Sequence, residues 1–465
     1  MSAMNTVSDV GQIRSHVQAL FPGLQADLEA LVRIPSVSAA GFDPSHVQAS
    51  AQQVAQLAYQ ALKPLTDGEP RVEILQAPTP DGSMGAPAVV ASIPAPPGAP
   101  TVMLYAHHDV QPPGQGWDTE PFTPTQVGDR LYGRGSADDK AGIIAHLGAL
   151  RTLAAAGCTP PVGITLFIEG EEEIGSPSFQ EFLTIHKDAL AADVIVVADS
   201  INWSVGVPAL TTGLRGLVDG CIEVEVLDHG VHSGMFGGPI VDANVVLARV
   251  IASLHDDAGS VAVEGLSTAP PPTVDIDEET FRVDSSLLPG AQLVGTGSIT
   301  GRMWCQPAIS VIGIDATPVA LAANLLAPSA RAKISVRIAP GQDPAVADAA
   351  MARHVEAHAP WGATVRWVPG EQGKPFLAPG DSPAMACARG AFADAWGTPS
   401  VDIGVGGSIP FIADLLESFP RASIVVTGVE DPDSRAHGAN ESVHLGELAK
   451  VVVAEALMLL RLGQV

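Results

Sequence analysis

The chain has 465 residues, of which 46% are hydrophobic and 16% are charged. At roughly 100 to 200 residues per domain, this length predicts two or three domains, and the composition excludes a disordered or collagen-like chain. The 24 basic and 51 acidic residues give a net charge of −27, which repels phosphate groups from most of the surface. We therefore expect no nucleic-acid partner and no binding to anionic membranes.

The four cysteines lie far apart and form no CxxC pair; they are Cys158, Cys221, Cys305 and Cys387. This spacing favours neither a disulfide framework nor a thiolate zinc site, so reduced thiols are the simplest interpretation. The N-terminal residues show no basic head followed by an apolar stretch, and no run of about 18 apolar residues could span a bilayer. A cytoplasmic protein is the expectation.

The N-terminal part of the chain predicts an α/β domain. Apolar residues at helical spacing between 11 and 33 predict a first helix that ends before Pro35. Short β-rich runs then alternate with helical stretches, which is typical of a largely parallel sheet buried on both faces. The expected strands are 71–75, 101–105, 162–168 and 193–198, and the expected helices are 139–156 and 178–188.

The pattern changes at residue 213. The next expected elements are strand 215–227, helix 240–255, strands 308–315 and 331–339, helix 343–358 and strand 363–368. Their β-α-β-β-α-β order is that of a ferredoxin-like unit. Because helix 382–396, strand 422–428 and helix 441–462 then resume the first pattern, we predict a domain of residues 213–375 inserted between two parts of a larger domain, 1–212 and 376–465.

Polar segments of the larger domain follow its apolar strands. They are YAHHDVQP (105–112), LYGRGSADDKAG (131–142), GEEEIGSPSF (170–179), Asp199 and DPDSRAHGANESV (431–443). Each alone has an ordinary explanation, since an aspartate often begins a helix and acidic loops are usually solvated. Strand ends of a doubly wound sheet share one edge, however, so these side chains can converge there. Two imidazoles and several carboxylates suit a pair of zinc ions.

Within the first segment, His107 and Asp109 fall on one face of the strand end. One of them could bind a metal ion while the other orients it, since a carboxylate that takes the second ring proton fixes the tautomer of an imidazole. A hydrogen-bonded pair that caps the strand is the structural alternative. His108 points the other way, and we expect it not to be a ligand.

At these strings the sequence resembles the cocatalytic di-zinc peptidases and amidohydrolases, which include cytosolic dipeptidases, carnosinase, glutamate carboxypeptidase and aminoacylases. The resemblance covers nearly the whole chain and is strongest to the dipeptidase branch. It implies a zinc-exopeptidase-like catalytic domain with an inserted ferredoxin-like domain that serves as lid and dimerisation domain. It also implies two zinc ions per subunit, with manganese or cobalt as alternatives that such ligands also accept.

The resemblance further implies the role of each site residue. The implied metal ligands are His107 and Asp199 for one ion, Glu173 and His437 for the other, and Asp138 as the bridge. Asp109 matches the carboxylate that orients the first histidine. Glu172 matches the general base that activates the water attacking the scissile carbonyl, which leaves Glu171 outside the catalytic role. A cis peptide bond is implied between Asp138 and Asp139.

The inserted domain carries DHGVHSGMFGG, which resembles the lid motif of the family. In that motif a histidine, here His232, reaches the active site of a neighbouring subunit and donates to the oxyanion, which implies a homodimer. A loop histidine bonded to its own turn is the alternative. Further matches to substrate-contacting positions are Arg337, Asn324, Gly407, Ser408 and Ile409.

One departure concerns substrate recognition. Dipeptidase relatives often have Arg-Glu ahead of the GGSIP loop, whereas Gly404 and Val405 stand here. Arg337 and Arg215 remain candidates for binding an anionic substrate end.

Three functions are compatible with these residues. The leading one is hydrolysis of dipeptides or short peptides, favoured by the chain length and by the HSGMFGG, GGSIP and DDKAG strings. An N-acyl-amino-acid amidohydrolase would use the same site. A catalytically silent metal-binding scaffold is disfavoured, because it would not need Glu172. A nucleophile-based hydrolase is disfavoured as well, because no GxSxG string occurs.

Overall fold

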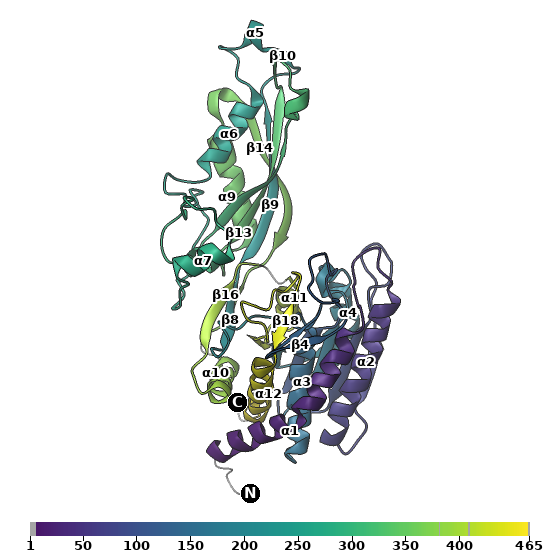
Figure 1. Ribbon diagram of the computed structural model, residues 1–465. Coiled ribbons are helices and arrows are strands. Elements are labelled where there is room, and N and C mark those ends of the chain that lie inside the picture. Colours follow the sequence, from purple (N-terminus) through teal and green to yellow (C-terminus); the bar gives the residue numbers. More distant parts are fainter. Residues whose placement is uncertain (1–5, 381, 408–409, 464–465) are drawn as a thin grey trace. The chain divides into compact units, whose positions relative to one another are not determined.

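A computed structural model describes residues 6–380, 382–407 and 410–463 of the chain (Figure 1). The described residues form two compact units. The larger unit comprises those within Met1–Thr212, Ala378–Asp402 and Asp414–Val465, and the inserted unit comprises those within Gly213–Leu377 and Ile403–Ala413. The domain boundaries drawn from the sequence at 212 and 375 stay a prediction, and the two units are described one after the other.

The sheet of the larger unit has parallel strands at its centre. Its order is β1 (Arg71–Leu75), β2 (Ala88–Ile93), β6 (Gly163–Glu169), β3 (Thr101–His107), β7 (Val194–Val197), β17 (Ser423–Val426) and β8 (Ala209–Leu214). The pairs β6–β3, β3–β7 and β7–β17 are parallel, whereas β1–β2, β2–β6 and β17–β8 are antiparallel. The α/β fold class is confirmed, but the expected largely parallel sheet is wrong at its edges. The strand β2, absent from the predicted elements, follows the loop of residues 76–87 and pairs with β1.

Helices cover both faces of this sheet. On one face α1 (Thr6–Val32), α2 (Ser45–Leu62), α3 (Lys140–Ala155), α10 (Pro383–Trp396) and α12 (Leu445–Leu462) share a continuous apolar core with the strands. On the other face lies α4 (Phe179–Leu190), whose Phe179 and Phe182 stack on Phe167 of β6. Alternate residues of β6 therefore face opposite layers, which explains why the strand reads as a continuous apolar run.

Smaller elements complete the larger unit. A second sheet joins β18 (Ser442–His444), β5 (Arg130–Tyr132) and β4 (Thr125–Val127) in that order. The strand β16 (Val401–Val405) and the helix α11 (Pro410–Ser418) span positions where the chain passes between the two units. None of the described helices is long and apolar enough to cross a membrane, and all four cysteines are unpaired, as expected.

The inserted unit has the element order of a ferredoxin-like domain. Its elements are β9 (Gly216–Glu225), α6 (Ala243–Ser253), β11 (Ala308–Asp315), β13 (Ser329–Ile338), α9 (Pro344–Ala357) and β14 (Thr364–Gly373). The strands form an antiparallel sheet in the order β11-β13-β9-β14, and Figure 1 shows α6 and α9 beside it. Shorter elements are β10 (Val231–His232), α5 (Ser233–Phe236), α7 (Glu278–Asp284), α8 (Ile299–Trp304), β12 (Leu325–Leu326) and β15 (Phe376–Leu377).

The two faces of this sheet differ in chemistry. Even-numbered residues of β9 and β13, such as Val218, Ile222 and Val336, are buried in an apolar core with α6 and α9. Since successive side chains of a strand point to opposite faces, the odd-numbered residues of both strands lie on the face away from the helices. We call this the open face. It carries charged side chains, which become important below.

Candidate metal centre and active site

The predicted metal ligands of the larger unit lie where its parallel strands end. His107 is the last residue of β3, Asp199 follows β7 by two residues, and Glu173 lies in the turn after β6. Asp138 precedes α3, and His437 lies in the loop after β17. Because parallel strands present their carboxyl ends at one edge of a sheet, residues separated by more than 300 positions in the sequence come together.

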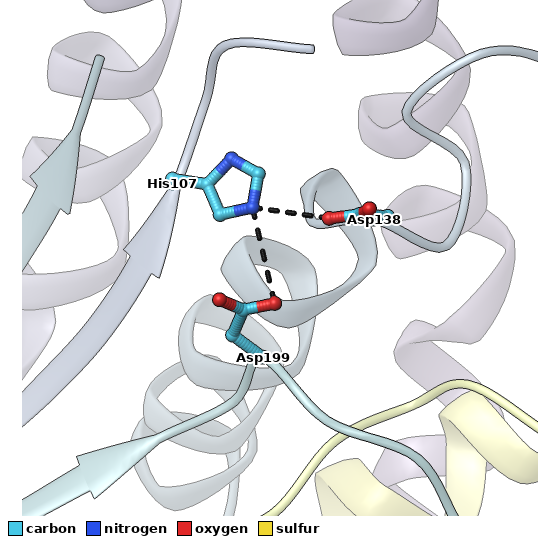
Figure 2. A group of neighbouring side chains, drawn as sticks. All are labelled: His107, Asp138 and Asp199. Atoms are coloured by element: carbon cyan, nitrogen blue, oxygen red, sulfur yellow. Dashed lines mark hydrogen bonds and ion pairs between the residues drawn. The ribbon is translucent and has the colours of Figure 1, made fainter. Parts of the chain in front are cut away.

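Two groups of ligand atoms share Asp138. In the first, the Nε2 atom of His107 lies 3.1 Å from Oδ1 of Asp138 and 3.9 Å from Oδ1 of Asp199 (Figure 2). In the second, the Nε2 atom of His437 lies 3.0 Å from Oδ2 of Asp138 and 3.1 Å from Oε2 of Glu173. Each oxygen of Asp138 thus faces a different histidine, which is the arrangement that a bridging carboxylate requires.

This donor set fits two divalent metal ions. Within each group the ligand atoms lie within 4.8 Å of one another. Imidazole nitrogens and carboxylate oxygens are the ligands that zinc accepts alongside thiolates, and two-metal hydrolytic sites hold their ions about 3.5–4 Å apart. One carboxylate between two such groups is therefore well placed to serve both ions.

The electrostatics of the site also favour bound cations. Hydrogen bonds to Asp138 and Glu173 raise the pKa of His437 to about 11. Burial lowers the pKa of His107, but bonds to two buried aspartates outweigh it and hold this pKa well above the ordinary value. Burial and neighbouring carboxylates raise the pKa of Asp199 to about 7, although His107 opposes them. The surplus of carboxylates stabilises any positive charge placed among them.

Asp109 does more than orient one ligand. It is fully buried, and Nδ1 of His107 lies 3.2 Å from its backbone carbonyl oxygen and 3.4 Å from its Oδ1 atom, so both groups of Asp109 face the ring. Its two carboxylate oxygens also accept hydrogen bonds from the backbone N–H groups of Glu172 and Glu173, each at 3.2 Å. A single carboxylate therefore positions a histidine and the turn that carries two glutamates. The sequence indicated only the first of these roles.

Glu172 lies beside the two ligand groups. Burial, reinforced by the carboxylates of Asp199 and Glu173 and opposed by His107, raises the pKa of Glu172 well above its ordinary range. A raised pKa makes a glutamate a stronger proton acceptor than an ordinary carboxylate, which suits a general base that later delivers the proton as an acid.

Two neighbouring residues point away from the cluster, as expected. Glu171 accepts hydrogen bonds from the backbone N–H of Ser178 and of Ala86, both at 2.7 Å, so its carboxylate is committed to the surrounding loops. The Nε2 atom of His108 lies 2.8 Å from the carbonyl oxygen of Pro87. Burial lowers the pKa of His108 to about 4, so its ring is neutral.

The bond between Asp138 and Asp139 is cis, as predicted. Asp139 accepts a hydrogen bond from the backbone N–H of His107 at 3.2 Å. A Cβ atom at Gly142 would lie 2.3 Å from Oδ1 of Asp139, so only glycine fits at this position of the DDKAG string.

A buried ion pair that the sequence did not indicate joins two loops of the site. Arg134 and Glu441 are fully buried and form a salt bridge. Glu441 also accepts from the backbone N–H groups of Ala137 and Asp138, at 2.9 and 3.1 Å, while Arg134 donates to the carbonyl of His437 at 3.0 Å. The pair therefore holds the bridging aspartate and the second histidine in one frame.

Glu430 is a further acidic residue that was not predicted. Burial and the nearby carboxylates of Asp138 and Asp199 raise the pKa of Glu430 well above its ordinary value. Like the other site residues, Glu430 comes shortly after a strand, β17. The convergence of polar residues at strand ends could therefore have indicated Glu430 from the sequence.

The inserted unit carries the remaining predicted residues. His232 is exposed, and its Nδ1 atom accepts a hydrogen bond from the backbone N–H of Gly234 at 3.1 Å, which leaves Nε2 to carry the proton. The carbonyl of Asn324 accepts from the N–H of Ser233 at 3.0 Å, so these two predicted residues lie on neighbouring segments. Arg337 lies on β13. Gly407 is described and half-buried, whereas Ser408 and Ile409 lie outside the described residues.

The sequence of this chain is similar to those of known peptidases. Residues 103–461 match the model of peptidase family M20/M25/M40. The Cysteinylglycine-S-conjugate dipeptidase of Corynebacterium striatum is 37% identical over 373 residues, which cover 79% of this chain and 82% of the relative. The Beta-Ala-His dipeptidase of Rattus norvegicus is 29% identical over 378 residues, which cover 77% of this chain and 76% of the relative.

A solved structure extends the similarity to the fold. The crystal structure of human carnosine dipeptidase 1 matches with a TM-score of 0.74 at 25% identity, and the match covers 98% of this chain and 99% of that chain. The family match includes every residue of the two ligand groups. The chain therefore belongs to peptidase family M20/M25/M40.

Proposed function

We propose that this protein is a metallopeptidase that hydrolyses dipeptides or short peptides and holds two zinc ions per subunit. The observation that carries the proposal is the pair of ligand groups that share Asp138, with Glu172 beside them. The names of the relatives support the substrate class, since both the bacterial and the rat protein are dipeptidases.

The proposed roles follow from the geometry of the larger unit. His107 and Asp199 would hold one ion, Glu173 and His437 the other, and Asp138 both. When bound, these ions supply Lewis acidity and lower the pKa of water to near neutrality. Glu172 takes the proton of the attacking water and then delivers it to the leaving amine. Asp109 keeps His107 in the tautomer whose Nε2 atom faces the ligands, and it fixes the turn that carries the base.

The inserted unit is proposed to act as lid and dimerisation domain. Since the Nδ1 atom of His232 accepts a hydrogen bond, its exposed ring can donate through Nε2 to an oxyanion. In a homodimer this donor would serve the active site of the other subunit. Arg337, Asn324, Gly407 and Ser408 are the proposed substrate contacts. A cytoplasmic location is part of the same proposal, supported by the four unpaired cysteines.

The test compares zinc-loaded protein with chelator-treated protein on two matched sets of compounds. One set contains unblocked dipeptides, including Cys-Gly S-conjugates and β-Ala-His, and the other contains the corresponding N-acetyl amino acids. Release of free amino acid is measured. We expect chelator-sensitive cleavage of the dipeptides, restored by adding zinc. Metal content per subunit is measured on the same samples, and manganese and cobalt are tested in place of zinc.

Two results would contradict the proposal. A clear preference for the N-acetyl compounds would make the protein an amidohydrolase that uses the same residues. Tight binding of two metal ions without hydrolysis of any compound would favour a metal-binding scaffold.

A further inference from the structure

The two histidines of the candidate metal centre are held in different ways. The side chain of His107 is 1% exposed, and the carboxylate of Asp109 lies beside its second ring nitrogen. The side chain of His437 is 60% exposed, and no acid among the described residues lies within ion-pair distance of its Nδ1 atom. Because no carboxylate orients this ring from that side, the placement of His437 depends on the backbone that carries it.

The loop that carries His437 has an unfavourable backbone. Arg435, His437 and Asn440 have positive φ angles of 56°, 62° and 62°. Residues other than glycine rarely adopt this left-handed region, because the Cβ atom crowds a backbone carbonyl oxygen. Half of the non-glycine residues with positive φ in the described part of the chain lie in this one loop. The loop therefore needs contacts from other segments to keep this conformation.

Contacts of this kind come from residues 111–118, a loop a few residues after β3. Asp118 and Asn440 bond to one another twice. The backbone N–H of Asp118 donates to Oδ1 of Asn440 at 2.8 Å, and Nδ2 of Asn440 donates to Oδ2 of Asp118 at 2.9 Å. One of the residues with positive φ is therefore fixed by its own side chain to the 111–118 loop.

A second contact runs through the guanidinium group of Arg134. Its Nη2 atom donates to the carbonyl oxygen of His437 at 3.0 Å and to that of Pro112 at 3.4 Å. The ring of Trp117 covers this guanidinium group, with its centroid 5.5 Å from Cζ, and its Nε1 atom donates to the carbonyl oxygen of Pro113 at 2.6 Å. A cation over an aromatic face is attracted to it, so Trp117 keeps Arg134 between the two loops.

The 111–118 loop also orients the other ligand of the second group. The backbone N–H of Gln111 donates to Oε1 of Glu173 at 2.9 Å, and its side-chain amide donates to the carbonyl oxygen of Glu173 at 3.0 Å. The Oε2 atom of Glu173 faces the Nε2 atom of His437 at 3.1 Å. The loop thus contacts both segments whose ligands belong to the second group alone.

We propose that the 111–118 loop sets the affinity of the protein for the metal ion of the second group, and that Trp117 and Asn440 are positioning residues for that ion. The inference rests on the proposed two-ion site. Neither residue supplies a ligand atom to either group. Contacts behind a ligand fix its orientation before the ion binds, so their loss weakens binding while every ligand remains. Because Asp109 orients His107, the ion of the first group does not depend on this loop.

The experiment titrates zinc into metal-free protein by calorimetry, with a competing chelator for tight binding steps. W117A removes the ring over Arg134, and W117F keeps an aromatic ring there. N440G removes both bonds to Asp118, and since glycine readily adopts positive φ, the substitution does not strain the backbone. H437A removes a ligand and so identifies the binding step of the second group.

A matched control comes from the inserted unit. The ring centroid of Trp361 lies 5.0 Å from Cζ of Arg249, so W361A removes the same kind of contact far from the metal ligands in sequence. Thermal unfolding of each variant shows whether it is folded. If W117A does not fold, W117F and N440G test the loop from its two sides.

We expect W117A and N440G to weaken the step that H437A removes about 10- to 100-fold and to leave the other step unchanged. W117F should recover part of the loss, and W361A should match the wild type. Equal weakening of both steps would overturn the proposal, since the contacts would then act on the whole site. Unchanged affinities, or a wild type that binds fewer than two ions, would overturn it as well.

Hydrolysis of a dipeptide is measured separately, which distinguishes this inference from the proposed function. Excess zinc should restore kcat in W117A, because all the ligands are present. A protein with the expected zinc affinities that cleaves no dipeptide would contradict the peptidase function and support the inference. An active wild type whose variants bind zinc with unchanged affinity would contradict the inference alone.

Discussion

The edge of the larger unit's sheet where the metal-ligand candidates gather, here called the rim, carries a surplus of carboxylates, whereas most charges on the open face of the inserted unit are paired. At the rim, carboxylates outnumber the two histidines, and the pKa of Asp199 rises to about 7. On the open face, acids pair with Arg331, Lys333 and Arg366, whereas Arg337 lies near Arg215 and has no acidic partner among the described residues.

This difference shows how to separate a binding site from ordinary surface charge. A paired surface charge adds little to stability, typically below about 1 kcal/mol, and it does not require a ligand. A buried or half-buried group of like charges costs free energy unless an ion or ligand of opposite sign offsets it. By this criterion the surplus of carboxylates at the rim favours a bound cation, whereas the ion pairs of the open face require no ligand.

The largest expected effect comes from the base at the rim. E172Q should lower kcat by about 10²- to 10⁴-fold, because the proton acceptor is lost while the metal ligands stay in place. Metal content and kcat are measured on the same preparation. E171Q is the control, since Glu171 precedes the base in sequence but faces Ser178 and Ala86. Near wild-type activity in E172Q would remove the base assignment.

The second largest effect is expected at His232, the proposed hydrogen-bond donor of the inserted unit. H232A should lower kcat by about 10²- to 10³-fold with unchanged metal content, as the loss of one oxyanion donor does in other hydrolases. The exposed His229 lies three residues away and pairs with its neighbour Asp228, so H229A serves as the control. If H232A and H229A have the same kcat, His232 is only a loop residue.

A smaller effect is expected where a residue supports the ligands without touching the metal ions. E441Q should weaken metal affinity about 10- to 100-fold, because Glu441 holds the backbone of Asp138 and is paired with Arg134. Competition with a chelator measures the affinity. E447Q, at a buried glutamate bonded to Trp396, is the control. Equal metal affinities in the two variants would contradict the supporting role of Glu441.

The smallest expected effect is on the pH dependence of the free energy of unfolding, through a buried pair in the core of the larger unit. His146 of α3 is buried 2.8 Å from Glu455 of α12, and its other ring nitrogen lies 2.9 Å from the carbonyl of Tyr105. Burial lowers the pKa of His146, but Glu455 and the carbonyl outweigh it and raise the pKa above 6.5. The resulting stabilisation is fully present below pH 6.5 and is lost as the pH rises through the raised value.

Urea unfolding of the wild type and of H146Q/E455Q at several pH values tests the direction of this pH dependence. The free energy of unfolding should fall more steeply above pH 6.5 in the wild type, since the double variant lacks the titrating pair. The metal ligands are the same in both proteins, so the difference isolates the pair. Parallel curves would show that His146 does not change its charge in this range.

Local sequence patterns predict much of this molecule. Apolar runs such as 101–105 and 162–168 indicate buried strands, and the polar residues that follow them mark the rim. The pairing of Arg134 with Glu441 is not predictable in this way, because the two residues lie in distant segments and each reads as an ordinary surface charge. The sequence indicates Arg215 and Arg337 as candidates for an anionic substrate end, but it does not show the strand register that places them diagonally from one another.

The position of β17 in the sheet has a consequence for the synthesis of the protein. This strand comes late in the chain, yet it pairs with β7 on one side and with β8 on the other, and it precedes the loop that carries His437. A nascent chain that ends before β17 has an open gap in its sheet and only one of the two histidines at the rim. Because β17 must insert between β7 and β8, the peptidase becomes competent only after the segment that carries β17 and His437 has been synthesised.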